Sequence, residues 1–223
     1  MRYLFLVPIC LLLMGIFIYF EHQEKYELAV IFKGLASLMF VIFGILCAIQ
    51  AIDMKYTQMV KIGLVLGAIA DVLLDLRFVF KKKGKLLFLA GILVFLAGHI
   101  MYLVALIPGY DYLLITIILG IVASAIILKW IFSQIEAEKA FKIFGIFYIG
   151  VIVIMNAVAI RNAILLSSKG NIIFLFGALL FLASDIILIL NTFGKKSKFS
   201  LRIANLSLYY VGQLLIALSL YFR

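Results

Sequence analysis

Long apolar stretches separated by short polar segments run through the whole chain. Each stretch is close to the roughly 20 residues that an α-helix needs to cross the hydrocarbon of a bilayer. None alternates polar and apolar residues as a barrel strand does, and backbone groups in lipid must be hydrogen-bonded within their own segment. We therefore predict an all-α integral membrane protein with eight transmembrane helices. The predicted spans are residues 3–20, 28–50, 59–78, 86–106, 112–131, 143–164, 171–190 and 203–222.

The predicted helices form a single transmembrane domain, residues 1–223. No segment between them is long enough for a second domain, and none is a linker rich in proline and glycine. The first stretch opens with Arg2, as a signal peptide does, but no small-residue cleavage site follows Phe20. It is therefore predicted to remain as a helix.

Composition agrees with a protein that is solvated by lipid. Hydrophobic residues make up 67% of the 223 residues and charged residues only 13%, and the mean hydropathy is +1.28. A water-soluble globular domain of this length does not normally have such a balance. The net charge of +10 could suggest a nucleic-acid partner, but the charges lie between the apolar stretches. We therefore expect membrane lipid as the surroundings and no nucleic-acid partner.

The positions of the basic residues predict the orientation of the chain. With eight spans, the odd-numbered loops lie on one side of the membrane and both termini lie on the other. Of the 20 lysines and arginines, thirteen flank the odd-numbered loops and six flank the even-numbered loops or the termini. The positive-inside rule then places the odd-numbered loops in the cytoplasm. We expect a multi-pass protein of the bacterial cytoplasmic membrane.

The sequence contains a weak internal duplication. A shift of 114 residues aligns the predicted third and fourth helices with the seventh and eighth. Because this shift corresponds to four helices, two halves at about 1–111 and 112–223 would share one orientation, related by an axis along the membrane normal. The residues that carry the match are Asp71 with Asp185, Lys81 with Lys195, Lys82 with Lys196, and Gly98 with Gly212.

Two aspartates inside predicted spans, Asp71 and Asp185, are the strongest candidates for chemistry. An unpaired carboxylate in lipid is costly, so such residues face the protein interior and usually serve function. The structural alternative is a polar pair that fastens helices together. Asp75 lies one helical turn after Asp71 and could join it, or it could form an interfacial salt bridge with Arg77.

Several other polar residues could support the two aspartates. His99 could carry a proton or donate a hydrogen bond, although a histidine bonded to a neighbouring helix is an equal alternative. The chain has only one other histidine, so a site with three histidine ligands is excluded, and we expect no metal. Ser184, directly before Asp185, lacks the G-x-S-x-G context of a hydrolase nucleophile and is predicted only as a supporting residue. The remaining candidates, each of which alone is more often a helix–helix contact, are Tyr102, Asn156, Tyr209 and Gln213.

Lys33 is the only lysine well inside the predicted second helix. Its side chain could extend to the membrane surface, which is the structural alternative. Beside an acidic pocket it could instead hold a lipid phosphate as a point charge. We keep both interpretations.

At these residues the sequence resembles the YhhN family of membrane proteins, which includes mammalian lysoplasmalogenases. The resemblance lies in five ordered blocks: IFKGLASL, GAIADVLLDL, FLAGHIMYL, GALLFLASDIILILNTF and YYVGQLLIALS. The chain departs from the family pattern at Ala70, often glycine, and at Gly34, commonly proline. The resemblance implies hydrolysis of the vinyl ether bond of a lysophospholipid substrate, a lysoplasmalogen. The products would be a fatty aldehyde and a glycerophospho-ethanolamine or -choline, and no cofactor is implied.

Vinyl ether hydrolysis suits a pair of carboxyl groups. One acid protonates the vinyl carbon, while the other, ionised, stabilises the resulting cation and positions water. We expect Asp71 and Asp185 to fill these roles in an order that the sequence leaves open. One alternative is a small lipid or solute transporter or binding module that uses the same acids as a proton relay. Another is a hydrolase of a different lysolipid, and the oligomeric state is also open.

Overall fold

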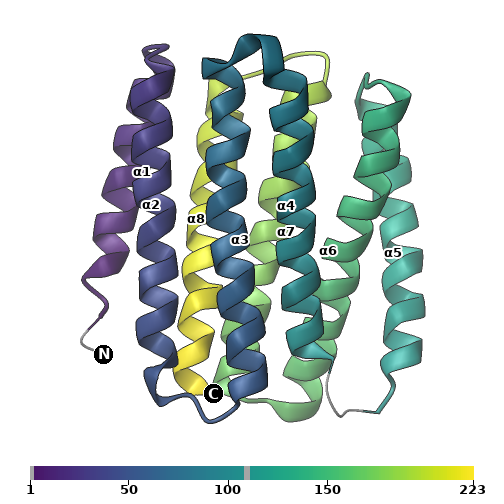
Figure 1. Cartoon of the computed structure of the whole chain (residues 1–223). Coiled ribbons are helices and arrows are strands. Elements are labelled where there is room, and N and C mark those ends of the chain that lie inside the picture. The colour runs from purple at the N-terminus through teal and green to yellow at the C-terminus, as the bar shows by residue number, and fades with distance from the viewer. Residues whose placement is uncertain (1–2, 108–110) are drawn as a thin grey trace.

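The computed structural model describes residues 3–107 and 111–223, and within these ranges it is an up-and-down bundle of eight α-helices without strands (Figure 1). Each predicted apolar stretch coincides with one helix, so the all-α prediction is confirmed. Three short 3₁₀ turns, η1 (Ala48–Gln50), η2 (Lys81–Lys83) and η3 (Leu220–Phe222), extend helix ends. The helices are α1 (Leu6–His22), α2 (Tyr26–Cys47), α3 (Met54–Val79), α4 (Gly84–Leu106), α5 (Leu113–Gln134), α6 (Lys139–Leu166), α7 (Lys169–Phe193) and α8 (Phe199–Ser219).

Six of the described helices, α2 and α4 to α8, are long and apolar enough to cross a membrane. Helix α1 is apolar but has only 17 residues. Helix α3 is not among the six, and it carries Asp71, Asp75 and Arg77 within its last turns. The chain is thus a multi-pass membrane protein by its apolar helices, and the number of eight spans stays a prediction.

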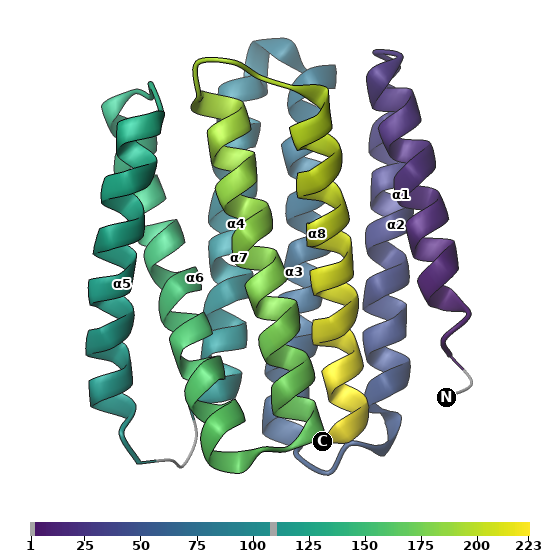
Figure 2. The same ribbon diagram turned by 180° about the vertical axis from the view of Figure 1, so that it is seen from behind.

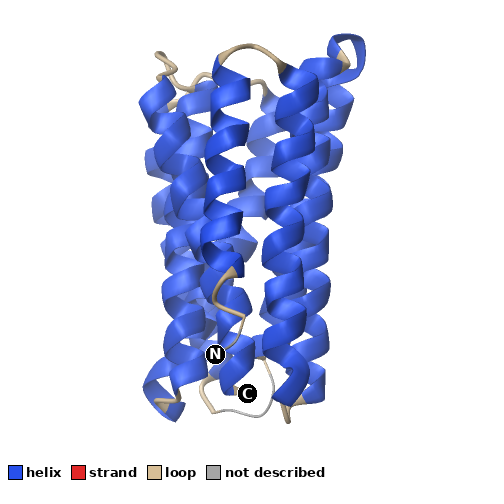
Figure 3. Ribbon diagram, turned by 90° about the vertical axis from the view of Figure 1, so that its left-hand side faces the viewer, coloured by secondary structure: helices blue, strands red, loops and turns tan. Residues whose placement is uncertain are grey.

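Both termini lie at the same end of the bundle, as an even number of antiparallel helices requires (Figures 1 and 3). The opposite end holds the α1–α2, α3–α4, α5–α6 and α7–α8 connections, which include Lys81 to Lys83 and Lys195 to Lys198. We call it the lysine-rich end. That this end faces the cytoplasm stays a prediction.

The hairpins α3–α4 and α7–α8 form the centre of the bundle. Helices α1 and α2 flank them on one side, and α5 and α6 flank them on the other (Figures 1 and 2). Between the layers lies a core of fully buried aromatic side chains, which positions the polar residues described below. They include Phe40, Tyr102, Phe174, Phe181 and Tyr210.

Glycines allow the two helices of each central hairpin to approach closely. A Cβ atom added at Gly98 would lie 3.2 Å from the carbonyl oxygen of Gly63, and one added at Gly212 would lie 2.9 Å from that of Gly177. Small residues are the usual means by which membrane helices bring their backbones together. The two pairs are separated by the shift of 114 residues, so the crossings are at equivalent positions. Equivalence of the whole halves stays a prediction.

Candidate active site

Buried polar side chains gather inside the bundle toward the lysine-rich end. Asp71 on α3 and Asp185 on α7 are 2% and 4% exposed, and both line one cavity of about 30 Å³. On this measure about 10–15 Å³ suffices for one water molecule. We call it the aspartate cavity. Two aspartates that lie 114 residues apart in the sequence therefore line one space that is large enough for water.

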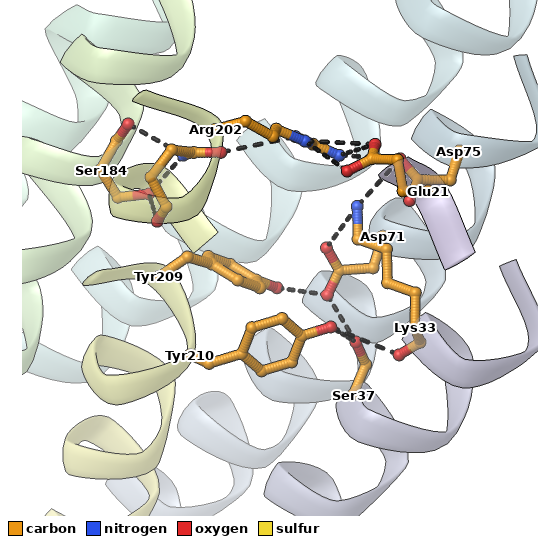
Figure 4. Close-up of polar contacts among 10 residues, drawn as sticks. Glu21, Lys33, Ser37, Asp71, Asp75, Ser184, Arg202, Tyr209 and Tyr210 are labelled. Atoms are coloured by element: carbon orange, nitrogen blue, oxygen red, sulfur yellow. Dashed lines mark hydrogen bonds and ion pairs between the residues drawn. The ribbon is translucent and has the colours of Figure 1, made fainter. Parts of the chain in front are cut away.

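Asp71 is held by one cation and two hydroxyl groups. Its Oδ1 atom lies 3.4 Å from Nζ of Lys33, and its Oδ2 atom accepts hydrogen bonds from Ser37 Oγ and Tyr209 OH, each at 2.6 Å (Figure 4). The hydroxyl of Tyr210 lies 3.1 Å from Ser37 Oγ. Short hydrogen bonds of this kind fix the orientation of a carboxyl group. Asp71 is thus held in one position by side chains from α2 and α8.

A chain of alternating charges leads from Asp71 to the lysine-rich end (Figure 4). Nζ of Lys33 lies 3.1 Å from Oδ1 of Asp75, which lies 3.4 Å from NH2 of Arg202 on α8. Arg202 also donates to both carboxylate oxygens of Glu21 on α1, at 2.8–3.2 Å. Buried charges are costly unless they are paired. This series of ion pairs meets the requirement and connects α1, α2, α3 and α8.

Asp185 has different partners. Its Oδ2 atom accepts a hydrogen bond from Tyr148 OH on α6 at 2.7 Å, and Nε2 of His99 on α4 lies 3.9 Å away. This His99 nitrogen has no hydrogen-bond partner among the described residues. No lysine or arginine in the described part of the chain lies within ion-pair distance of Asp185, and no group of three or more metal-ligating side chains is found there. The two aspartates therefore differ in electrostatic setting.

Four of the predicted supporting residues make no hydrogen bond to either aspartate in the described part of the chain, and three of them join helices instead. Tyr102 donates to the Gln213 side chain at 2.8 Å, which joins α4 to α8. Asn156 donates to the carbonyl of Ile152 in its own helix. Ser184 donates to the backbone of α8 at 2.9 Å. Within the described ranges none of the four hydrogen-bonds to Asp71 or Asp185, whereas the predicted Tyr209, His99 and Asp75 all belong to the two networks above.

Several residues that contact the aspartates or their partners were not predicted from the sequence. Ser37 follows Lys33 by one helical turn, so its place on the same face of α2 could have been found. Tyr148 lies in an apolar helix and gave no signal. Arg202 counted only among the basic residues that flank the loops, and Glu21 had no predicted role, because hydropathy alone does not show that a charge near a helix end points inward.

Two further cavities adjoin the aspartate cavity. An apolar pocket of about 60 Å³ lies among α4 to α7 and shares Leu74, Phe88, Phe95 and Leu188 with it. At the lysine-rich end lies a wider cavity of about 440 Å³, the mouth cavity. It shares Arg77, Leu188, Arg202 and Asn205 with the aspartate cavity. A wide cavity at the lysine-rich end, a buried acidic cavity and an apolar side pocket thus adjoin one another.

The resemblance noted in the sequence is borne out by comparison with protein families. The model of the YhhN family matches residues 28–220. The chain belongs to the YhhN family. The match covers α2 to α8 and includes both aspartates and Lys33, whereas Glu21 on α1 precedes it. No curated protein and no solved structure matches this YhhN protein significantly.

Proposed function

We propose that this YhhN protein is an intramembrane hydrolase that cleaves the vinyl ether bond of lysoplasmalogens. The products are a fatty aldehyde and a glycerophospho-ethanolamine or -choline. One observation carries the proposal: two buried aspartates with different partners line one cavity, which adjoins both an apolar pocket and a polar entrance. Membership of the YhhN family is consistent with a hydrolase.

The reaction needs one acid and one carboxylate. Protonation of the vinyl carbon distal to the oxygen gives an oxocarbenium ion. A water molecule adds to this cation and loses a proton, and the resulting hemiacetal breaks its carbon–oxygen bond to give the aldehyde and the glycerol hydroxyl. The enzyme must donate one proton and recover one, and it must stabilise a positive charge in between. No net oxidation or reduction occurs.

The partners of the two aspartates support a division of roles. Asp71, ion-paired with Lys33 and hydrogen-bonded by two hydroxyls, is the carboxylate that stabilises the cation and orients water. Asp185 has no lysine or arginine beside it, so its uncharged form costs less in a buried site, and it is the proton donor. His99, 3.9 Å from Asp185, is placed to return the proton.

Aldehyde release from purified protein in detergent tests the proposal. Asp71→Asn and Asp185→Asn should each lower the rate by about 100-fold or more, the usual contribution of a positioned acid or base. Asp53→Asn is the matched control: Asp53 caps the start of α3 by accepting from the Tyr56 N–H at 3.0 Å, and asparagine caps equally well. Activity retained in either cavity variant, at wild-type folding, would sink the aspartate pair.

The same assay separates the remaining alternatives. A transporter or binding module would release no aldehyde but would show proton-coupled uptake in vesicles. A panel of lysolipids with acyl, alkyl and vinyl ether linkages identifies a hydrolase of a different lysolipid by its products.

A further inference from the structure

Two arginines line both the mouth cavity and the aspartate cavity, and they differ in what holds them. Arg202 is bound by other side chains of the protein. Its guanidinium donates to both oxygens of Glu21, to Asp75 at 3.4 Å and to the Asn205 side chain at 3.5 Å. Its donors are therefore used by the fold. This arginine positions α8 against α1 and α3.

Arg77 is placed by aromatic rings instead. Its guanidinium carbon lies 4.6 Å from the centre of the Phe78 ring and 4.5 Å from that of Phe88. In the part of the chain that the structure describes, no hydrogen bond or ion pair engages this guanidinium, although the side chain is half-buried. Stacking orients a planar guanidinium and leaves the N–H groups at its edge available. Arg77 is thus a lining residue of the mouth cavity whose guanidinium is positioned by stacking and whose N–H groups form no hydrogen bond within the described ranges.

The mouth cavity carries a surplus of positive charge. Its cationic lining residues are Arg77, Arg202 and Lys198, and its carboxylates are Glu21 and Glu24. Glu21 is already neutralised by Arg202. In this lining Arg77 and Lys198 therefore meet a single further carboxylate, Glu24. Asp75 of the adjoining aspartate cavity is already paired with Lys33 and Arg202, so the surplus favours an anionic guest.

We propose that Arg77 binds the phosphate group of a single-chain phospholipid in the mouth cavity. This rests on the proposed function only for the class of substrate. A guanidinium edge matches phosphate oxygens with two parallel hydrogen bonds. Leu188 lines all three cavities, and Phe88, which stacks on Arg77, also lines the apolar pocket. A lipid whose phosphate meets Arg77 and whose chain enters the apolar pocket has its glycerol linkage at the aspartate cavity.

This assignment differs from the predicted role of Lys33. The side chain of Lys33 is 3% exposed, and its ammonium is shared by Asp71 and Asp75. Lys33 lines the aspartate cavity but is not among the residues of the mouth cavity. A phosphate at Lys33 would have to displace two carboxylates, whereas no carboxylate in the described ranges lies within ion-pair distance of Arg77.

Binding of a lipid that cannot be cleaved tests the proposal apart from catalysis. The probe is a saturated alkyl lysolipid with a phosphoethanolamine headgroup, and its reference is the alkylglycerol of the same chain, which lacks phosphate. Isothermal titration calorimetry in an uncharged detergent gives both affinities. If charge-assisted hydrogen bonds hold the phosphate, Arg77→Gln should lower the affinity for the phosphate probe by about 10-fold to 100-fold and change the affinity for the alkylglycerol by no more than about twofold. Arg77→Lys, which keeps the charge but loses the fork, should fall in between.

Lys196→Gln is the matched control, because it removes one exposed cation at the same end of the bundle that lines none of the three cavities. It should change both affinities by no more than about threefold, as expected of a screened surface charge. The proposal is overturned if Arg77→Gln binds the phosphate probe as the wild type does, or if it loses both ligands equally. If Arg77→Gln does not fold, an unchanged preference for phosphate in Arg77→Lys overturns the paired hydrogen bonds.

Inorganic phosphate distinguishes a lipid headgroup from the free anion. We expect it to compete with the lysolipid only weakly, and only when Arg77 is present. Free phosphate that binds as tightly as the lysolipid would overturn the lipid assignment. Because the probe is not consumed, failed aldehyde release leaves the phosphate site standing, and failed binding leaves the aspartate pair standing.

Discussion

Removal of the Lys33 ammonium is the most demanding test of the buried ion network. Lys33→Met keeps most of the side-chain volume and deletes the charge between Asp71 and Asp75. The three side chains are only 3–4% exposed, so water cannot replace the lost cation without a rearrangement. Two carboxylates would then be left with fewer partners inside the bundle.

The size of the effect follows from the distances. At 3.1 and 3.4 Å, each pair is worth about 5 kcal/mol with an effective dielectric constant of about 20. Much of this offsets the cost of burying the lysine itself, and loss of one member of a buried pair typically costs about 3–5 kcal/mol. Arg202 still pairs with Asp75, and two hydroxyls still donate to Asp71. We therefore expect the lower end, about 3 kcal/mol.

Equilibrium unfolding in mixed micelles, followed by circular dichroism, measures this loss. Lys85→Met is the matched control, because Lys85 contacts Glu138 at 2.7 Å but both side chains are more than 60% exposed. It should cost at most about 1 kcal/mol. The double variant Lys33→Met/Asp71→Asn, which also removes a buried negative charge, should recover part of the stability. The reasoning is refuted if Lys33→Met and Lys85→Met lower the free energy of unfolding equally, or if the double variant is less stable than Lys33→Met alone.

Two further predictions follow from single contacts. Tyr148→Phe removes the 2.7 Å hydrogen bond to Asp185. It should lower kcat for aldehyde release by about tenfold, the contribution of one hydrogen bond, and leave KM nearly unchanged. An unaltered kcat would exclude a role for this hydroxyl. Gly212→Ala places a Cβ 2.9 Å from the Gly177 carbonyl oxygen and should cost about 1–3 kcal/mol in unfolding experiments. Gly150→Ala, where the added Cβ meets nothing within 4 Å, should be neutral or slightly stabilising through helix propensity, and equal losses at both positions would contradict the close approach.

The helices could be predicted from sequence because hydropathy and length alone decide which segments enter lipid. The pairing of Asp71 with Asp185 was also accessible, since intramembrane acids face inward and the 114-residue shift relates their positions. The partners of the two aspartates were not. When a helix is apolar on every side, its sequence does not show which face points into the bundle. The contact between Tyr148 and Asp185 could therefore not be predicted.

The sequence also did not show which charged side chains near helix ends point into the bundle. Arg202 and Lys198 are four residues apart and serve equally well as orientation signals, yet Arg202 is half-buried in an ion network and Lys198 is exposed. The difference depends on Glu21, which α1 brings from 181 positions away. A pairing of this separation depends on how α1 and α8 pack, which hydropathy does not report.

The least apolar helix occupies the centre of the bundle, and this has a consequence for how the chain is made. Helix α3 leaves the ribosome after α2 and long before α8. The aspartates of α3 pair with two cations, Lys33 and Arg202. When α3 enters the membrane, only Lys33 has already been synthesised. Asp71 and Asp75 must share that one ammonium until Arg202 follows at the end of translation. Biogenesis is thus expected to favour insertion of α2 and α3 together as a hairpin, with the last helix completing their neutralisation.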